Sequence, residues 1–233
     1  MKNTDDFEFE YNLDDNMGLQ ELVEIHVGDL TLPTGKIIAA DPFFTYEQRP
    51  FNRSVLPDKY PVFIYMAEID DEHHRIAYAK IKFRSDEANK WILAITDDIT
   101  KEELNELSED EFFGFPVDSG LACFLDEETN NQLMEKIDAL QELKPESNYY
   151  DEVLAEEFRA YSSKNKFSRE LGDWNDHHPD KDSDNNIIMF SSGWGDGYYP
   201  AYWGLNENGD TVELVIDFLI NEFEDEDEEE YED

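Results

Sequence analysis

The pattern of apolar and polar positions predicts three β-strands in the first half of the chain. Residues 62–69, 75–83 and 91–96 are short segments rich in aliphatic and aromatic side chains, and polar residues separate them. Apolar side chains recur with a period of two along residues 75–83, which is typical of a half-buried strand. The polar residues 70–74 between the first two segments predict a hairpin loop.

The same pattern returns near the end of the chain. Residues 187–190, 198–203 and 211–218 are predicted to be strands, and the last of these places its large apolar side chains on one face. Residues 206–210 combine Asn, Gly and Asp, so they predict a tight hairpin turn between the last two strands.

Helical signals lie between these two groups of strands. Thr100 and Glu103 have the spacing of a capping box that opens a short helix. Asp126 is expected to cap a longer helix, and residues 150–161 carry the apolar stripe of a third helix. The apolar face of the longer helix consists of Leu133, Met134, Ile137 and Leu140. Residues 162–186 are polar and lack periodicity, so we expect a long loop or a partly disordered excursion there.

Strands at both ends of the chain, with helices between them, indicate the α+β class. We expect a largely antiparallel β-sheet or sandwich core with about three helices in the middle of the chain. Residues 1–221 are predicted to form a single α+β domain. Residues 222–233 are almost entirely acidic and are predicted to form a disordered tail.

The chain is extremely acidic. It contains 59 Asp and Glu against 18 Lys and Arg, which gives a formal charge of −41, and residues 222–233 supply ten of the negative charges. The rest of the chain still carries −31, so the folded surface is acidic as well as the tail. Such a charge opposes binding to nucleic acids and anionic membranes, and it favours a basic protein partner. A general solubility role and a high-salt habitat are the alternatives.

Cys123 is the single cysteine, so no intrachain disulfide can form. It lies in an apolar run, and we expect a buried, unreactive thiol rather than a nucleophile. The first ten residues are acidic and lack the basic and apolar regions of a signal peptide. No apolar run approaches the ~20 residues of a membrane helix. The sequence therefore predicts a cytoplasmic protein.

Three segments differ from ordinary core and surface sequence; they are residues 33–42, 114–126 and 191–200. Their most distinctive parts are Phe-Pro-Val-Asp at 115–118 with the following Gly120, and Ser-Gly-Trp-Gly-Asp-Gly at 192–197. With residues 91–94 between them, these blocks resemble the bacterial family catalogued as domain of unknown function 4241. The resemblance runs from about residue 28 to residue 218, and the family brings no established activity or catalytic residues with it.

Several residues of these segments are candidates for a binding site: Asp41, Asp118, Trp194, Asp196 and Tyr198. Carboxylates in apolar or glycine-rich surroundings are exposed, hydrogen-bonded by backbone amides, or used in chemistry. One interpretation gathers these residues into an acidic, aromatic-lined pocket. The other makes the aspartates braces of turns and caps of helices, as already proposed for Asp126. The alternate glycines of residues 193–197 indicate a tight turn or a close approach of another group.

No metal or cofactor site is predicted. Residues 180–186 resemble the first half of a calcium loop, but Asn185 and Ser191 stand where that loop requires Gly and Glu. The histidine pairs at 73–74 and 177–178 lack converging ligands, and we expect them in surface loops.

Two functional hypotheses of different classes follow. The first is an acidic interaction protein of the immunity or antitoxin kind, which neutralises a basic toxin by filling its cationic groove. The second is a small-ligand-binding protein or a hydrolase-like enzyme that uses the candidate Asp, Trp and Tyr residues. A third is that the acidity only keeps the protein soluble. The sequence contains no nucleophile elbow, phosphate loop or zinc motif, and it leaves open whether the protein is an enzyme.

Overall fold

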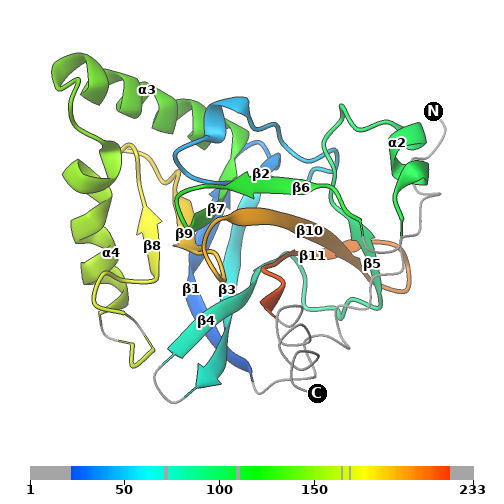
Figure 1. Cartoon of the computed structure of the whole chain (residues 1–233). Coiled ribbons are helices and arrows are strands. Elements are labelled where there is room, and N and C mark those ends of the chain that lie inside the picture. Colours follow the sequence, from blue (N-terminus) through cyan, green and yellow to red (C-terminus); the bar gives the residue numbers. More distant parts are fainter. Residues whose placement is uncertain (1–21, 71–72, 109–110, 164, 168, 221–233) are drawn as a thin grey trace, which may run out of the picture.

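A computed structural model of the chain describes residues 22–70, 73–108, 111–163, 165–167 and 169–220. Within these ranges the chain forms two antiparallel β-sheets, and helices from the middle of the sequence lie at one side (Figure 1). The predicted α+β class and its antiparallel sheets are therefore confirmed. The prediction of an acidic tail at residues 222–233 lies outside the described residues.

The larger sheet has its strands in the order β1-β3-β4-β11-β10-β5. In that order the strands are β1 (Leu22–Leu32), β3 (Asp58–Asp70), β4 (His73–Lys82), β11 (Thr211–Asp217), β10 (Gly197–Leu205) and β5 (Lys90–Leu93). Strand β6 (Gly114–Val117) pairs with the first part of β10, whereas β5 pairs with its last part. Because β6 and β10 belong to two of the distinctive sequence segments, this pairing brings those segments side by side.

The smaller sheet has the order β2-β7-β9-β8. Its strands are β2 (Ile37–Ala40), β7 (Leu121–Asp126), β9 (Ile187–Ser191) and β8 (Trp174–His177). Phe124 and Ile188 point into the core that faces the larger sheet, whereas Cys123 and Met189 point into a second core under the helices. Both faces are thus buried, which explains why β7 and β9 are uninterrupted apolar runs. Cys123 is buried as predicted, and burial raises the pKa of its thiol.

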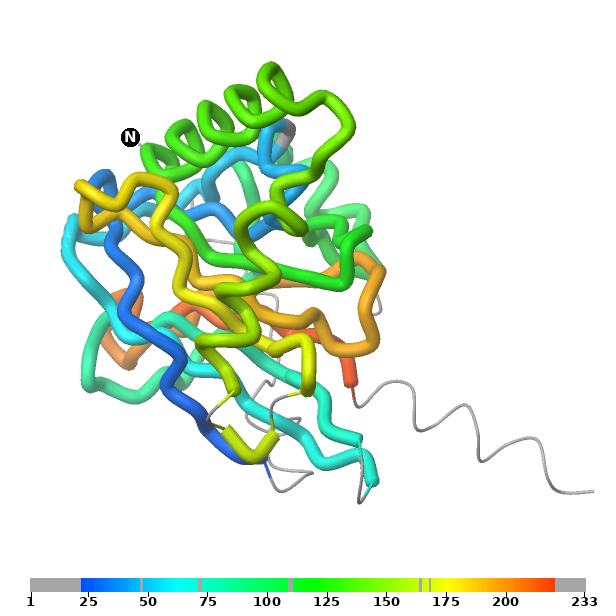
Figure 2. The backbone as a smooth tube through the Cα atoms, turned by 90° about the vertical axis from the view of Figure 1, so that its left-hand side faces the viewer, coloured from blue at the N-terminus to red at the C-terminus, as the bar shows by residue number. Residues whose placement is uncertain are grey.

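The helices cover the outer face of the smaller sheet, as Figures 1 and 2 both show. They are the long helix α3 (Glu127–Leu143), the π-helix η2 (Tyr150–Leu154) and α4 (Ala155–Ser162). The short elements η1 (Thr45–Glu47) and α2 (Lys101–Glu106) lie elsewhere. The predicted caps are confirmed: Thr100 forms a capping box with Glu103, and the Asp126 side chain accepts from the Glu128 amide. None of the described helices is long and apolar enough to cross a membrane.

Edge-to-face aromatic contacts join the two sheets. The ring centroids of Phe124 and Phe190 in the smaller sheet are 5.5 Å apart, and Phe190 lies 6.0 Å from Phe218, which follows β11. Tyr199 of β10 completes the chain at 5.0 Å from Phe218. Such pairs add to the burial of apolar area. They fix β9, β10 and the turn between them against one core.

Two parts of the chain differ from the sequence-based expectation. Strand β1 was not predicted, because it lies in an acidic stretch and most of its side chains are only partly buried or exposed. Residues 162–186 are not simply a long loop, because they include β8. The prediction that His177 lies in a surface loop is wrong, since its side chain is only 2% exposed. Polar partners on the neighbouring helices make the burial of this polar strand possible.

Candidate ligand-binding cleft

A cleft of about 890 Å³ opens between the helices and the turn that connects β9 to β10. One wall comes from α3, η2 and α4, and the opposite wall comes from the glycine-containing residues 119–121 and 191–195. The loop after α4 and the start of β4 close one end. The cleft therefore lies where regions far apart in the sequence meet, from Phe43 and Arg75 to the glycine-containing residues 191–195.

The two glycine-rich segments touch one another at the mouth of the cleft. The Ser192 amide donates to the Gly120 carbonyl over 3.2 Å, and a Cβ on Gly120 would lie 3.8 Å from the Gly195 Cα. The Gly195 carbonyl accepts from the Ser192 hydroxyl at 2.8 Å and from the Tyr199 hydroxyl at 3.0 Å. Gly193 has φ +45°, and a Cβ there would lie 2.8 Å from the Phe218 Cβ. The turn is thus tight and closely approached, as its glycine pattern predicts.

Trp194 stands out from this turn and lines the cleft. Its side chain is 44% exposed, and the Arg75 guanidinium lies 5.2 Å from the centroid of its ring. One nitrogen of Arg75 also donates to the His74 carbonyl at 3.1 Å. No carboxylate of the described residues forms an ion pair with Arg75. The pair therefore gives the cleft an aromatic face beside a guanidinium group that no described carboxylate pairs with.

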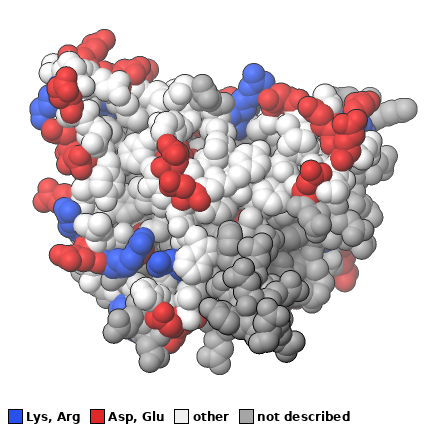
Figure 3. Space-filling model, viewed as in Figure 1, with Lys and Arg blue, Asp and Glu red and all other residues white. Residues whose placement is uncertain are grey.

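A second arginine is held at the same end of the cleft. The Arg169 side chain donates to Asp173 at 2.5 Å and to the Ser191 hydroxyl at 2.6 Å. Asp173 also accepts from the Arg169 backbone amide at 2.7 Å, and its side chain is buried. Three hydrogen bonds to buried groups order the arginine. Figure 3 shows basic side chains gathered low on the left of this face, beside a broad uncharged area.

The other end of the cleft is apolar and aromatic. Phe43 and Tyr150 lie edge to face with centroids 6.2 Å apart, and Phe158 lies 6.1 Å from Tyr150. Leu121 and Ile137 complete this part of the lining. Tyr150 begins the π-helix η2. Single π-helical turns are rare in proteins, but those that occur are frequently found at functional sites. The π-helix in this wall is therefore a further indication that the cleft is a functional site.

The five sequence candidates do not converge on the cleft. Trp194 lines it, whereas Asp118 and Asp196 are exposed at residues that directly flank its glycine-containing wall. Tyr198 stacks on Phe112 instead, with centroids 6.1 Å apart and an interplanar angle of 13°. Tyr198 borders a separate, smaller hollow rather than the cleft.

Asp41 is 1% exposed and does not reach the cleft lining. Its carboxylate accepts from the backbone amides of Phe43 at 2.9 Å, Asp118 at 3.0 Å and Ser119 at 2.8 Å. Asp126 is likewise occupied, because it caps α3 and accepts from the Thr34 hydroxyl. Asp41 thus braces a turn and Asp126 caps a helix, which is the arrangement that the second interpretation of the sequence describes. By holding residues 118 and 119, Asp41 supports the wall of the cleft from behind.

Sequence reasoning missed Arg75, Arg169 and Tyr149. The sequence pattern places Arg75 only within a predicted strand, and it places Arg169 within the segment that we expect to be a long loop. The sequence does carry one signal for them. Arginine is scarce in so acidic a chain, so an arginine without an evident acidic partner is a candidate binding residue.

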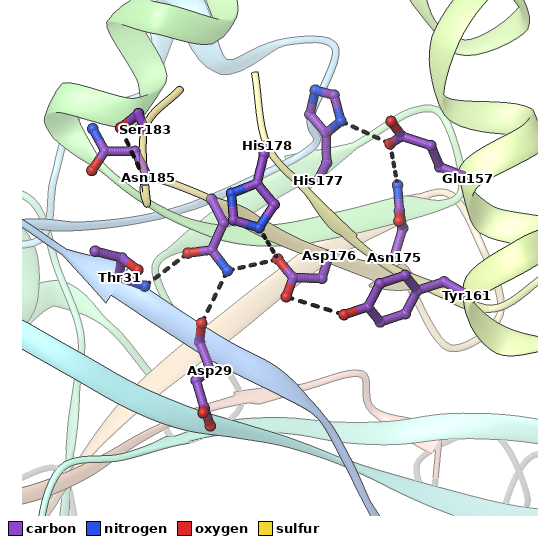
Figure 4. Close-up of polar contacts among 11 residues, drawn as sticks. Asp29, Thr31, Glu157, Tyr161, Asn175, Asp176, His177, His178, Ser183 and Asn185 are labelled. Atoms are coloured by element: carbon purple, nitrogen blue, oxygen red, sulfur yellow. Dashed lines mark hydrogen bonds and ion pairs between the residues drawn. The ribbon is translucent and has the colours of Figure 1, made fainter. Parts of the chain in front are cut away.

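A buried polar chain connects the cleft to the outer surface. The Tyr149 hydroxyl, from the cleft lining, lies 2.9 Å from Nε2 of His177. Nδ1 of His177 lies 2.8 Å from the Glu157 carboxylate (Figure 4). A proton on Nδ1 satisfies the carboxylate, so Nε2 accepts from the tyrosine. Asn175 also donates to Glu157, at 3.0 Å. Burial and the Glu157 charge raise the pKa of Tyr149 to about 12, so its hydroxyl stays protonated.

Asn186 and Asp176 form a second network beside the first. The side-chain amide of Asn186 donates to Asp176 at 2.6 Å and to the Asp29 carbonyl, and its oxygen accepts from the Thr31 amide at 2.8 Å. Tyr161 of α4 donates to Asp176 at 3.2 Å (Figure 4). These bonds tie β1, β8 and α4 together. Nothing in the described ranges groups three or more His, Cys, Asp or Glu side chains around a possible metal position.

The polar chain predicts how stability responds to acid. Burial alone would raise the pKa of Glu157, but hydrogen bonds from His177 and Asn175 outweigh it and hold the pKa below its usual 4.5. The ionised Glu157 carboxylate therefore stabilises the fold fully at pH values above its ordinary pKa. This stabilisation is lost as the pH falls through the lower pKa of the folded state. Urea unfolding should show a smaller difference between wild type and Glu157→Gln at about pH 3 than at about pH 5. A difference that is equal at both values would contradict this.

The fold and the cleft together define a class: a two-sheet α+β protein with a cleft between its helical layer and a glycine-rich turn. The chain belongs to the family described as protein of unknown function (DUF4241), whose model matches residues 30–216. The match includes both glycine-rich segments and both arginines of the cleft. No curated protein and no solved structure shows significant similarity to the chain.

Proposed function

We propose that this protein binds a small organic molecule in the cleft beside Trp194. The observation that carries the proposal is the cleft itself: its volume of about 890 Å³ lies in the range of ligand sites, and its lining combines aromatic walls with a few fixed polar groups. The distinctive glycine-rich segments meet there, and the π-helix forms part of the opposite wall. We place this activity in the cytoplasm.

The walls of the cleft are organised before a ligand arrives. Hydrogen bonds hold the Gly195 carbonyl, and Asp41 fixes the turn at residues 118 and 119. A ligand therefore meets a surface that needs little ordering, which favours affinity. Trp194 offers an exposed indole face beside apolar side chains, the kind of surface that marks a binding site.

Quenching of tryptophan fluorescence by acrylamide tests this proposal. Trp91, Trp174 and Trp203 are buried, so quenching reports mainly on the exposed Trp194. Molecules that raise the melting temperature in a screen of small compounds should also protect Trp194 from acrylamide. Trp194→Phe removes the quenchable signal and serves as the control. Compounds that stabilise the protein while leaving quenching unchanged would place the binding site elsewhere, and the absence of any stabilising compound would count against a ligand site.

The acidic surface supports a second candidate function. A formal charge of −41 favours association with a basic protein, as expected of an immunity or antitoxin factor. Such a partner should co-purify from the native cell at low salt and dissociate as salt increases, because screening weakens long-range attraction. If no basic protein is retained at low salt, this candidate is excluded, and the ligand proposal is unaffected.

A further inference from the structure

The cleft differs in charge from the rest of the protein. Acidic residues outnumber basic ones 59 to 18 in the whole chain, yet the charged side chains that line the cleft are Arg75, Arg169 and Glu170. Acidic residues are thus depleted at the place where a ligand would bind. A cleft with this lining does not repel an anion as the surrounding surface does.

We infer that the ligand of this cleft is a small organic anion with an apolar body. The inference rests on the proposed function and adds the chemical class of the ligand. Its carboxylate or phosphate binds at Arg75 and Arg169, and its apolar part lies between Phe43, Ile137 and Tyr150. Guanidinium groups bind both kinds of anion through paired N–H donors.

Arg75 supplies the charge by which the cleft selects anionic over uncharged ligands. Its guanidinium is held on the Trp194 ring and by one backbone carbonyl, and neither contact neutralises it. Arg169 is ordered by the buried Asp173, so its charge is already balanced. Of the two guanidinium groups that line the cleft, Arg75 is therefore the one whose charge no contact with a described carboxylate balances. A ligand anion there completes an ion pair that the described part of the protein leaves open.

The apolar end lies against the helices, away from the arginines. Ile137 belongs to α3 and Tyr150 to η2, whereas Arg75 lies near the start of β4 and Arg169 in the loop that follows α4. Figure 1 shows α3 at the top of the molecule and the end of β4 that carries Arg75 at the bottom left. The cleft is thus polarised along its length. An anion without an apolar part would leave the aromatic half unfilled.

A matched pair of fluorescent probes tests the inference. Anilinonaphthalene sulfonate carries an anionic group on an apolar body, and phenylnaphthylamine is its uncharged parent. We expect wild type to bind the sulfonate more tightly, and Arg75→Gln to weaken that binding about tenfold while changing phenylnaphthylamine binding less than about twofold. Arg75→Lys should restore part of the affinity for the sulfonate.

Arg84→Gln is the control for net charge, because it removes the same charge from an exposed ion pair with Asp210. Arg84 lies about 30 Å from Arg75 along the strand direction, so sulfonate binding should not change. Equal affinity for both probes, with no effect of Arg75→Gln, would overturn the anionic class but leave a ligand cleft. If neither probe protects Trp194 from acrylamide, the ligand cleft itself is excluded. Methyl phosphate and acetate as competitors then distinguish the two kinds of anionic group.

Discussion

Gly35→Ala is expected to lower the free energy of unfolding by about 4 kcal/mol. Gly35 has φ +72°, and a Cβ there would lie 2.0 Å from the Val55 carbonyl oxygen. The Gly35 carbonyl accepts from the Val55 amide at 2.9 Å, so the two backbone segments cannot move apart without losing that hydrogen bond. Alanine thus meets both an unfavourable backbone conformation and a clash with rigid atoms. Urea denaturation measures the change directly.

Gly209→Ala separates these two causes. Gly209 has φ +78°, close to that of Gly35, but no atom lies within 4 Å of a Cβ built there. Its replacement should cost only about 1–2 kcal/mol, the penalty for a left-handed conformation. If both variants lose the same stability, the close approach at Val55 does not constrain the fold.

Asp41→Ala should cost about 3 kcal/mol, because it leaves three partly buried backbone amides without their acceptor. Two of these amides belong to residues 118 and 119, at the wall of the cleft. Sulfonate binding should therefore weaken in parallel with the loss of stability. Urea denaturation and probe titration on the same preparation give both quantities.

Asp196→Ala is the matched control for this aspartate. Asp196 is exposed, so its replacement should change stability by less than about 0.5 kcal/mol. A different outcome for Asp41 would revise its role: full stability of Asp41→Ala with abolished ligand binding would make Asp41 a binding residue. Loss of stability confirms it as a brace.

Much of the fold could be predicted because local signals agreed with the tertiary structure. The period of two in residues 75–83 marked β4, and the Asn and Gly residues at 206–210 marked the turn between β10 and β11. Thr100 and Asp126 marked the starts of two helices. These features depend on neighbours in sequence, which is why they can be recognised without the structure.

Strand β8 could not be predicted, since partners far along the chain make its burial favourable. His177 carries no local sign that Tyr149 and Glu157 will satisfy both of its ring nitrogens. The candidate site was predicted only in part for the same reason. The glycine pattern around Trp194 marked the turn correctly, but the approach of Arg75 depends on how β4 lies beside that turn. Likewise, nothing local shows that Asp41 is occupied by the amides of residues 118 and 119.

Backbone amide NMR of the protein during titration with anilinonaphthalene sulfonate tests the central claim most directly. Binding in the cleft should shift the amide signals of residues 119–121, 169–172 and 193–195 first, and Arg75→Gln should suppress these shifts. Signals around the exposed Arg84 serve as an internal reference and should not move. Shifts that concentrate outside the cleft, or that persist unchanged in Arg75→Gln, would contradict an anion-binding cleft beside Trp194.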